Sequence, residues 1–304
     1  MSYTNEILAQ DVSTVKQLSL FLKNGTFIVS LAAIAQVYVI SVFLSIQLNA
    51  AVGIAPLLAF GVYGINNLTD SEEDFVNQPW NSQYSRRWNR FIGVLSVVLH
   101  FVGVGIAFYY GSLVAGLLSL IPLTAQLVYS SAWLPFKEIK RLKQVLVLNS
   151  FIVAGAWVVK VVALPIALTT NHVPLDTAIA AGLFIFVRWF MSVEVANVPD
   201  IHGDISANVD SVPIKYGIDG TRRIMYGLEI LSALVLSYLL VTVETPIAVL
   251  VVLPILVYTA TAEYLFCREG WAEYLSISWD VSFVLMGIVV AGADFLTGLP
   301  GGFF

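Results

Sequence analysis

The stretch FIVSLAAIAQVYVISVFLSI, residues 27–46, runs for twenty positions without an Asp, Glu, Lys or Arg. An α-helix rises about 1.5 Å per residue, so a helix of this length crosses the roughly 30 Å hydrocarbon core of a bilayer. The whole chain shares this character: 58% of its 304 residues are hydrophobic and only 12% are charged, about half the charged share of an ordinary soluble domain. The sequence therefore predicts an integral membrane protein.

Further apolar stretches of spanning length follow the first, separated by polar connections. They predict an all-α, multi-pass membrane protein of about nine transmembrane helices in a bundle. No polar segment is long enough to bury a core of its own, so residues 1–304 are predicted to form one transmembrane domain, with residues 1–23 as its cytoplasmic N-terminal segment. The predicted spans are residues 27–46, 48–66, 91–110, 112–131, 145–168, 176–195, 224–243, 246–266 and 277–297.

The positive charges lie on one side of the predicted membrane. Long connections (residues 67–90, 132–144, 196–223 and 267–276) alternate with short ones, so all four are predicted on the same face. These connections and the N-terminal segment carry thirteen Lys and Arg residues, whereas the opposite connections and the C-terminal tail carry none. Because cytoplasmic loops are enriched in Lys and Arg, we predict a multi-pass cell-membrane protein with a cytoplasmic N-terminus and an outside C-terminus.

Few residues are available for a metal site of the zinc or haem kind. Cys267 is the only cysteine, and His100, His172 and His202 are the only histidines. An intrachain disulfide is excluded, and a zinc or haem site has no support in the sequence.

An acidic segment, NNLTDSEED, covers residues 66–74 after the second predicted span. Asn66, Asp70 and Asp74 recur every four residues, so on a continued helix they line one face. Carboxylates at that spacing repel one another, and a cation bound between them offsets the cost. Mg²⁺ accepts carboxylate and amide oxygens, so these three residues are candidate metal ligands.

A second acidic segment, NVPDIHGD, covers residues 197–204 and leaves the sixth span on the same predicted face. Asn197, Asp200 and Asp204 again share one side of a helix. Two acidic faces that open on one central cavity at the cytoplasmic side would each hold a Mg²⁺ and clamp a diphosphate between them. A solvated loop explains a single Asp, but two spaced clusters at matching ends of two spans favour a metal site.

Both motifs resemble those of the UbiA superfamily of intramembrane prenyltransferases, in particular its archaeal and bacterial members. The resemblance extends over essentially the whole chain, through the number of spans and the order of the loops. Residues 203–217 resemble the family's Gly-Asp…Gly-Val…Thr-x-Pro…Gly run, and residues 129–149 its Tyr-Ser…Arg-Leu-Lys…Gly-Asn stretch. Arg188 is similar to an Arg that many members carry before the second motif.

The chain departs from the family pattern at three places. The first motif opens with Asn66-Asn67 instead of Asn-Asp, and Asn197 replaces a common acidic residue. The family's Asn-x-Pro-x-Arg-Pro element reads NQPWNS at residues 77–82, without its Arg. Each change removes charge near the expected metals or diphosphate, so the metal pattern is kept while the subfamily and its acceptor stay open.

The resemblance implies an enzyme that transfers a prenyl group from a polyprenyl diphosphate to a hydrophobic acceptor, with two Mg²⁺ ions bridged by the substrate diphosphate. The expected acceptor is an aromatic or quinone precursor or an isoprenoid; a glycerol-phosphate ether lipid or a carotenoid is the alternative. Membrane lipid is an expected partner and nucleic acid is not. The implied catalytic residues are Asp70, Asp74, Asp200, Asp204 and Tyr129.

Basic residues are expected to bind the diphosphate, because phosphate oxygens take charge-assisted hydrogen bonds from such groups. The candidates are Lys23, Lys140, Arg141, Lys143 and Arg188. For those in the loops, the alternative is that they act only as topology signals. Arg188 lies inside the sixth span, about three helical turns from Asp200, so it is expected to pair with Glu194 or with the substrate.

A cation-coupled membrane transporter is the competing functional class. It predicts acidic residues near the bilayer midplane and interrupted helices in both halves. The acidic clusters instead lie at one predicted face and most spans are unbroken, which favours the enzyme. Lys160, near the middle of the fifth span, has no counterpart in the family pattern, and its role is left open by the sequence.

Overall fold

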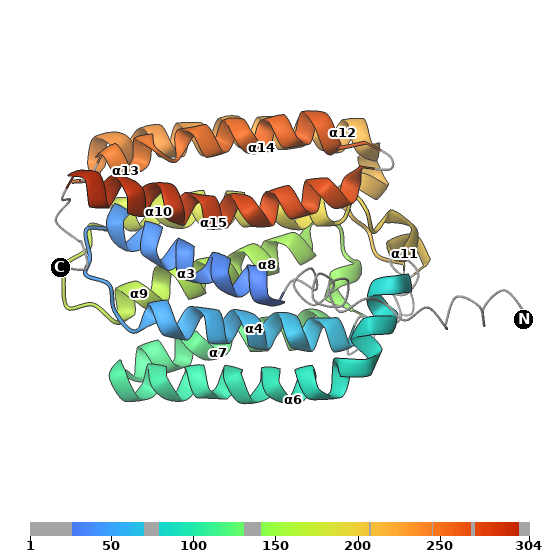
Figure 1. The fold of residues 1–304 in the computed structure, drawn as a ribbon, viewed down its shortest axis with the longest axis horizontal. Helices are drawn as coiled ribbons and strands as arrows, with labels where there is room; N and C mark the ends of the chain where they lie inside the picture. Colours follow the sequence, from blue (N-terminus) through green and yellow to red (C-terminus); the bar gives the residue numbers. More distant parts are fainter. Residues whose placement is uncertain are drawn as a thin grey trace, which may run out of the picture.

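The computed structural model describes residues 26–69, 79–130, 141–206, 208–244, 246–268 and 271–297. All regular structure in these residues is helical, and nine helical segments among them are long and apolar enough to cross a membrane (Figure 1). The prediction of an all-α, multi-pass protein with about nine spans is confirmed.

Several spans are single helices and two are composite. The fifth combines α8, a short π-helical turn and α9, and the eighth combines α13 and α14. The spanning elements are α3 (Thr26–Phe43), α4 (Ala51–Thr69), α6 (Pro79–Tyr110), α7 (Leu113–Ser130), α8 (Leu148–Val158) with the π-turn Val159–Ala163 and α9 (Leu164–Ala167), α10 (Leu175–Ala196), α12 (Val212–Thr242), α13 (Pro246–Leu250) with α14 (Leu253–Phe266), and α15 (Ala272–Thr297).

The connections are more helical than the sequence predicted. Residues 196–223 were expected to form a polar connection, but they contain α11 (Ile201–Ser206) and the first turns of α12. Hydropathy misses this start because the turns carry charges such as Lys215 and Arg222. Gly217 has a φ of 69° inside α12, a backbone conformation that glycine adopts without the steric cost of a Cβ. The helical reading of the acidic segment agrees with α11, but the predicted start of the seventh span at residue 224 was too late, because α12 begins at Val212.

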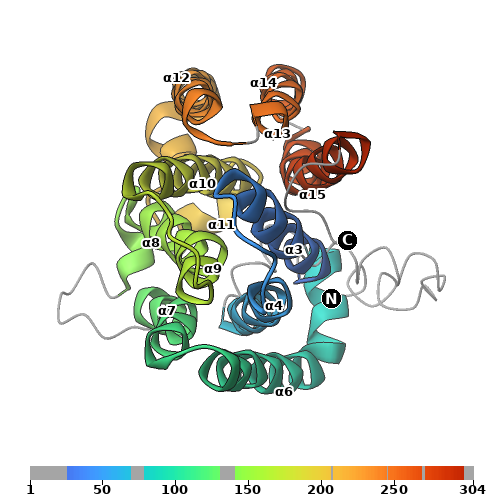
Figure 2. The ribbon, with the colours of Figure 1, turned by 90° about the vertical axis from the view of Figure 1, so that its left-hand side faces the viewer.

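The helices pack as a closed series of neighbours. α3 contacts α4, α4 contacts α7, α7 contacts α8, α8 contacts α10, and α10 contacts α15, which returns to α3. Viewed end-on, α6 lies outside α4 and α7, while α12 and α14 lie on the opposite side, beyond α10 and α15 (Figure 2). This arrangement brings residues far apart in the sequence to the same end of the bundle.

Two glycines allow α4 and α6 to approach closely. A Cβ built on Gly61 would lie 2.6 Å from the Cβ of His100, and one built on Gly64 would collide with the Ser96 side chain. Small residues at such interfaces let membrane helices approach until their backbones nearly touch. This contact fixes α4, which carries Asn66 at its C-terminal end.

The fifth span widens into a π-helical turn at Val159–Ala163, which ends two residues before Pro165. Proline has no backbone N–H, so it cannot complete the i→i−4 ladder of an α-helix. The wider turn accommodates this break, and such turns are frequent at functional sites. Lys160 lies within the turn, so its position is set by this local irregularity.

Candidate functional site

The predicted site residues that the structure describes are grouped mainly at one end of the bundle. We call this the α11 end; it comprises α11, the C-terminal ends of α4, α7 and α10, and the N-terminal end of α8 (Figure 1). Four predicted residues, Lys23, Asp70, Asp74 and Lys140, lie outside the described residues.

Asn66 and Tyr129 are brought together although they lie on different spans. The Tyr129 hydroxyl donates to Asn66 Oδ1 at 2.8 Å, and Gln126 Nε2 donates to the same oxygen at 2.7 Å. The structure thus places a predicted metal ligand next to the aromatic residue favoured for the site. Two donors already occupy this oxygen, so metal coordination by Asn66 requires Gln126 and Tyr129 to turn away from it.

Asp200 and Asp204 lie on one helical turn. The backbone N–H of Asp204 donates to the carbonyl of Asp200 at 2.9 Å, the i→i+4 bond of an α-helix, so the two residues share a face. Both are partly exposed at the α11 end, while Gly203 between them is buried. The predicted helical spacing of this acidic pair is therefore present.

Glu194 anchors the segment that carries this acidic pair. Its side chain is 1% exposed, and Oε1 accepts a hydrogen bond from the Ser150 hydroxyl on α8 at 2.5 Å. Oε2 accepts from the Val212 backbone N–H, at the start of α12, at 3.1 Å and from Asn197 Nδ2 at 3.2 Å. One carboxylate thus joins α8, α10 and α12 around α11, with three donors to satisfy its burial.

Asn197, a predicted metal ligand, is partly oriented by this contact. Its amide nitrogen donates to Glu194, which leaves Oδ1 as the atom available to a cation, as the prediction requires. Carboxylate and amide oxygens of this kind suit Mg²⁺ rather than a softer metal. No group of three or more His, Cys, Asp or Glu residues forms a metal-binding cluster within the part of the chain that the structure describes, so this donor set is a partial one.

The second long connection reaches the acidic segment. Leu142–Gln144 forms a short 3₁₀ turn, and the Gln144 carbonyl accepts a hydrogen bond from the backbone N–H of Asp210 at 3.4 Å. Two predicted diphosphate ligands come shortly before Gln144 in the chain: Arg141 is half-buried and Lys143 is 4% exposed. The structure therefore places these basic residues in a turn that contacts the connection between α11 and α12, which follows the second acidic motif.

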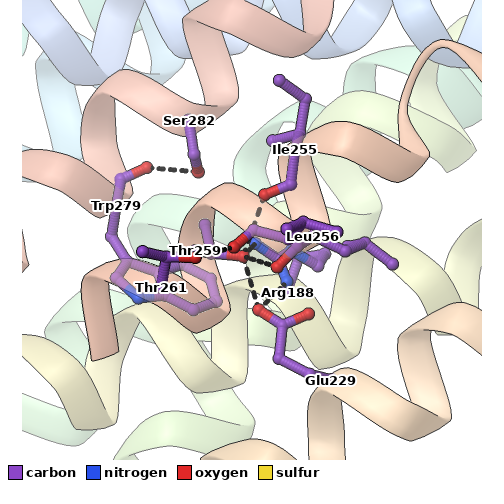
Figure 3. A network of polar contacts seen from close by, with 9 residues as sticks. Arg188, Glu229, Ile255, Leu256, Thr259, Thr261, Trp279 and Ser282 are labelled. Atoms are coloured by element: carbon purple, nitrogen blue, oxygen red, sulfur yellow. Dashed lines mark hydrogen bonds and ion pairs between the residues drawn. The ribbon is translucent and has the colours of Figure 1, made fainter. Parts of the chain in front are cut away.

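Arg188 lies elsewhere, in the interior between α10, α12, α14 and α15. Its Nη1 donates to Glu229 Oε1 at 2.8 Å and its Nη2 to Thr259 Oγ1 at 3.1 Å, while the guanidinium carbon lies 4.2 Å from the centre of the Trp279 ring (Figure 3). The sequence had suggested Glu194 or substrate as its partner. The structure gives it Glu229, and its role toward diphosphate stays a prediction.

Two buried acidic residues were missed by sequence reasoning. Glu229 and Glu263 are both buried inside predicted spans, and an acidic residue in a span is a signal that would have found them. Glu194 was noted only as a partner for Arg188. Its anchoring role could not be read from the sequence because Ser150 and Val212 are distant along the chain.

The sequence matches the UbiA prenyltransferase family over residues 25–292, and none of the curated proteins matches it. Among solved structures, the fold is similar to a UbiA homolog from Archaeoglobus fulgidus bound to GPP and Mg²⁺, with a TM-score of 0.60 and 16% identity, covering 88% of this chain and 99% of that chain. The same homolog bound to DMAPP and Mg²⁺ gives a TM-score of 0.58 and 16% identity, covering 88% and 98%.

A UbiA homolog from Aeropyrum pernix K1, in its apo structure, has a TM-score of 0.57 and 14% identity, covering 89% of this chain and 98% of that chain. At such low identities these likenesses establish the fold and nothing finer. The family match over most of the chain is the stronger finding.

Proposed function

The chain belongs to the UbiA prenyltransferase family, and we propose that it transfers a prenyl group from a polyprenyl diphosphate to a hydrophobic acceptor in a Mg²⁺-dependent reaction. The observation that carries the proposal is the position of the second acidic motif. Asp200 and Asp204 lie on one helical turn at the α11 end, and the buried carboxylate of Glu194 fixes the surrounding chain. Solved relatives of the same fold bind GPP or DMAPP together with Mg²⁺.

Six residues are proposed to hold two Mg²⁺ ions bridged by the diphosphate: Asn66, Asp70, Asp74, Asn197, Asp200 and Asp204. Of these, Asn197, Asp200 and Asp204 supply oxygen donors within one short segment. When bound, Mg²⁺ neutralises charge on the diphosphate and so eases its departure. Asn66 joins this set by exchanging its hydrogen bonds with Gln126 and Tyr129 for a metal contact.

Basic side chains are proposed to bind the diphosphate oxygens that the Mg²⁺ ions leave open. Arg141 and Lys143 lie in the turn whose Gln144 contacts Asp210, in the connection that follows α11, and their cationic groups suit charge-assisted hydrogen bonds to phosphate oxygens. Lys23 and Lys140 are proposed for the same role. Arg188 is proposed to contribute less to diphosphate binding than these residues, because its guanidinium is already paired with Glu229.

The transfer breaks the bond between C1 of the prenyl chain and a diphosphate oxygen, and the electron pair leaves with the diphosphate. An electron-rich atom of the acceptor then bonds to C1, and the acceptor loses a proton. Water would convert the prenyl cation to an alcohol, so the reaction needs a dry interior. Nine spans in lipid provide such an interior. Tyr129 is proposed to lie at the α11 end of this interior, beside Asn66.

The proposed acceptor is an aromatic or quinone precursor or an isoprenoid, and the proposed orientation places the α11 end in the cytoplasm. The orientation rests on the thirteen Lys and Arg residues of the long connections and N-terminal segment. It also places a water-soluble diphosphate product at the face from which it can leave.

The test uses full-length protein in nanodiscs with radiolabelled geranylgeranyl diphosphate, with Mg²⁺ or with EDTA. We expect Mg²⁺-dependent donor binding, and diphosphate release that increases when the correct acceptor is added. Equal binding with and without Mg²⁺, or no binding across several prenyl lengths by a folded protein, would contradict the proposal.

A further inference from the structure

A second interior lies beside the one that carries the proposed reaction site. Its helices contact one another in a closed series: α10 with α12, α12 with α14, α14 with α15, and α15 with α10. Arg188, Glu229 and Thr259 meet inside it (Figure 3). The Asn66–Tyr129 pair belongs to α4 and α7, outside this group of helices. The polar residues of the second interior therefore need an explanation of their own.

Glu263 gives this second interior an unbalanced negative charge. It lies on α14 four residues after Thr259, so the two side chains share a helix face, and its carboxylate interacts electrostatically with Glu229 and Arg188. Glu263 is 0% exposed, and within the described part of the chain neither of its oxygens has a hydrogen-bond partner. Because Arg188 already neutralises Glu229, the charge of Glu263 is left uncompensated.

Three carboxylate oxygens of this cluster are buried without a hydrogen-bond partner among the described residues. They are Oε1 and Oε2 of Glu263 and Oε2 of Glu229. The other oxygen of Glu229 accepts from Arg188 at 2.8 Å and from Thr259 at 2.5 Å. Buried polar atoms without a partner are rare in folded proteins, and a bound water or ion is one reason for them. Since a buried charge is normally paired or coordinates a metal, these oxygens are suited to a ligand of positive charge.

One monovalent cation satisfies this cluster better than one proton does, although either would cancel the charge. A proton on Glu263 is donated to one acceptor and leaves the second oxygen of Glu263 bare, whereas a cation takes all three oxygens as ligands. A divalent ion would leave a positive charge uncompensated instead. Carboxylate oxygens are hard ligands, and three of them suit Na⁺ better than the larger K⁺, which channels surround with rings of carbonyl oxygens.

We propose that Glu263 and Glu229 bind a Na⁺ ion between α12 and α14, next to the Arg188–Glu229 ion pair. This inference is independent of the proposed function. The ion enters from the α11 end, because α14 ends there at Phe266 (Figure 1), three residues or roughly 4–5 Å along the axis after Glu263. Once bound, it holds α12 and α14 against α10, the helix that carries Glu194.

The test measures Na⁺ binding by the full-length protein in dodecyl maltoside, a neutral detergent, at neutral pH with EDTA and without a prenyl diphosphate. Binding of radioactive Na⁺ should saturate at about one ion per chain, and NaCl in place of choline chloride at equal ionic strength should raise the melting temperature by about 3 °C or more. KCl should give a smaller rise. Absence of either sodium effect would overturn the inference, and an equal rise with KCl would overturn the choice of Na⁺.

Glu263→Gln keeps the size of the side chain and removes the charge that the ion compensates. We expect this variant to bind Na⁺ roughly tenfold more weakly or worse and to lose the rise in melting temperature. Glu244→Gln is the matched control, because Glu244 is an exposed carboxylate two residues after the end of α12, and it should behave as the wild type does. Glu263→Leu takes the place of Glu263→Gln if the latter does not fold. A folded Glu263 variant that keeps both sodium effects would contradict the site.

The acidic motifs at the α11 end are the other place that a cation could occupy in this protein. Asp204→Ala removes a proposed Mg²⁺ ligand and should leave both sodium effects unchanged, because Asp204 lies on α11, outside the second interior. Loss of the sodium effects in Asp204→Ala but not in Glu263→Gln would assign the ion to those motifs and overturn the inference. Donor binding with Mg²⁺ tests the proposed function separately, and its failure would leave the sodium result intact.

Discussion

The guanidinium of Arg188 and the carboxylate of Glu229 form an ion pair of 2.8 Å, and the two side chains are 0% and 8% exposed. They come from α10 and α12, and Thr259 of α14 bonds to both. Such a pair repays the loss of hydration only while both partners are present. The contact therefore ties the second half of the bundle to the site-bearing helix α10.

Removal of one member of this pair should be more damaging than removal of both. Arg188→Met or Glu229→Gln leaves a buried group without its partner, and we expect each to destabilise the protein by about 3–5 kcal/mol. The double variant should recover part of that loss. Thermal unfolding in detergent measures this, and additive effects of the two single changes would contradict the coupling.

Glu194→Gln should disturb the site without unfolding the bundle. The carboxylate accepts three hydrogen bonds through its two oxygens. Glutamine keeps one oxygen and replaces the other by an amide nitrogen that cannot accept, so at least one donor loses its acceptor and a loss of about 1–3 kcal/mol is expected. Mg²⁺-dependent binding of the prenyl diphosphate should weaken even at temperatures where the variant is still folded, because α11 loses its anchor.

Ser150→Ala is the comparison for Glu194→Gln. It removes one donor to Glu194 and leaves the carboxylate with Asn197 and Val212, so its effect should be smaller in both measurements. An equal loss of donor binding in the two variants would count against the anchoring role.

Asp200→Ala and Asp204→Ala should each abolish prenyl transfer while the protein stays folded, and the same is expected of Asp70→Ala and Asp74→Ala. Loss of one group that stabilises developing charge typically costs roughly two orders of magnitude in rate or more. Asp210→Ala is the control, because Asp210 is an exposed carboxylate shortly after the same segment and is not one of the proposed metal ligands. Retained transfer in two of the four variants would remove the metal assignment.

Cys267 gives a pH-dependent probe of the loop between α14 and α15. Burial raises the pKa of this thiol from its ordinary 9.0 to about 11, with Glu263 adding to the rise. The neutral thiol is therefore kept at pH 9 in the folded protein. Because the thiolate is the nucleophile, iodoacetamide should label the native protein at pH 9 much more slowly than the unfolded chain.

The same raised pKa predicts how stability varies with pH. Between about pH 9 and pH 11 the unfolded thiol ionises while the folded one does not, so this group's contribution is complete below pH 9 and is lost as the pH rises through 11. Cys267→Ser should flatten that part of the pH–stability profile. An unchanged profile would show that Cys267 is not the group responsible.

The sequence by itself determined the membrane class, the number of spans and the spacing of the acidic motifs. Each depends on local quantities: runs of apolar residues set the spans, and helical periodicity sets the common face of Asp200 and Asp204. The start of α12 at Val212 was missed because charged turns outside the bilayer carry no hydropathy signal.

Only the tertiary structure decided which polar groups meet. Tyr129 reaches Asn66 across 63 positions, and Arg188 reaches Glu229 across 41, and no periodicity links such pairs. The same holds for Glu194 with Ser150 and for Lys160 on the face of Trp157. A span's composition shows that a buried polar residue needs a partner, but the packing order of the helices selects that partner.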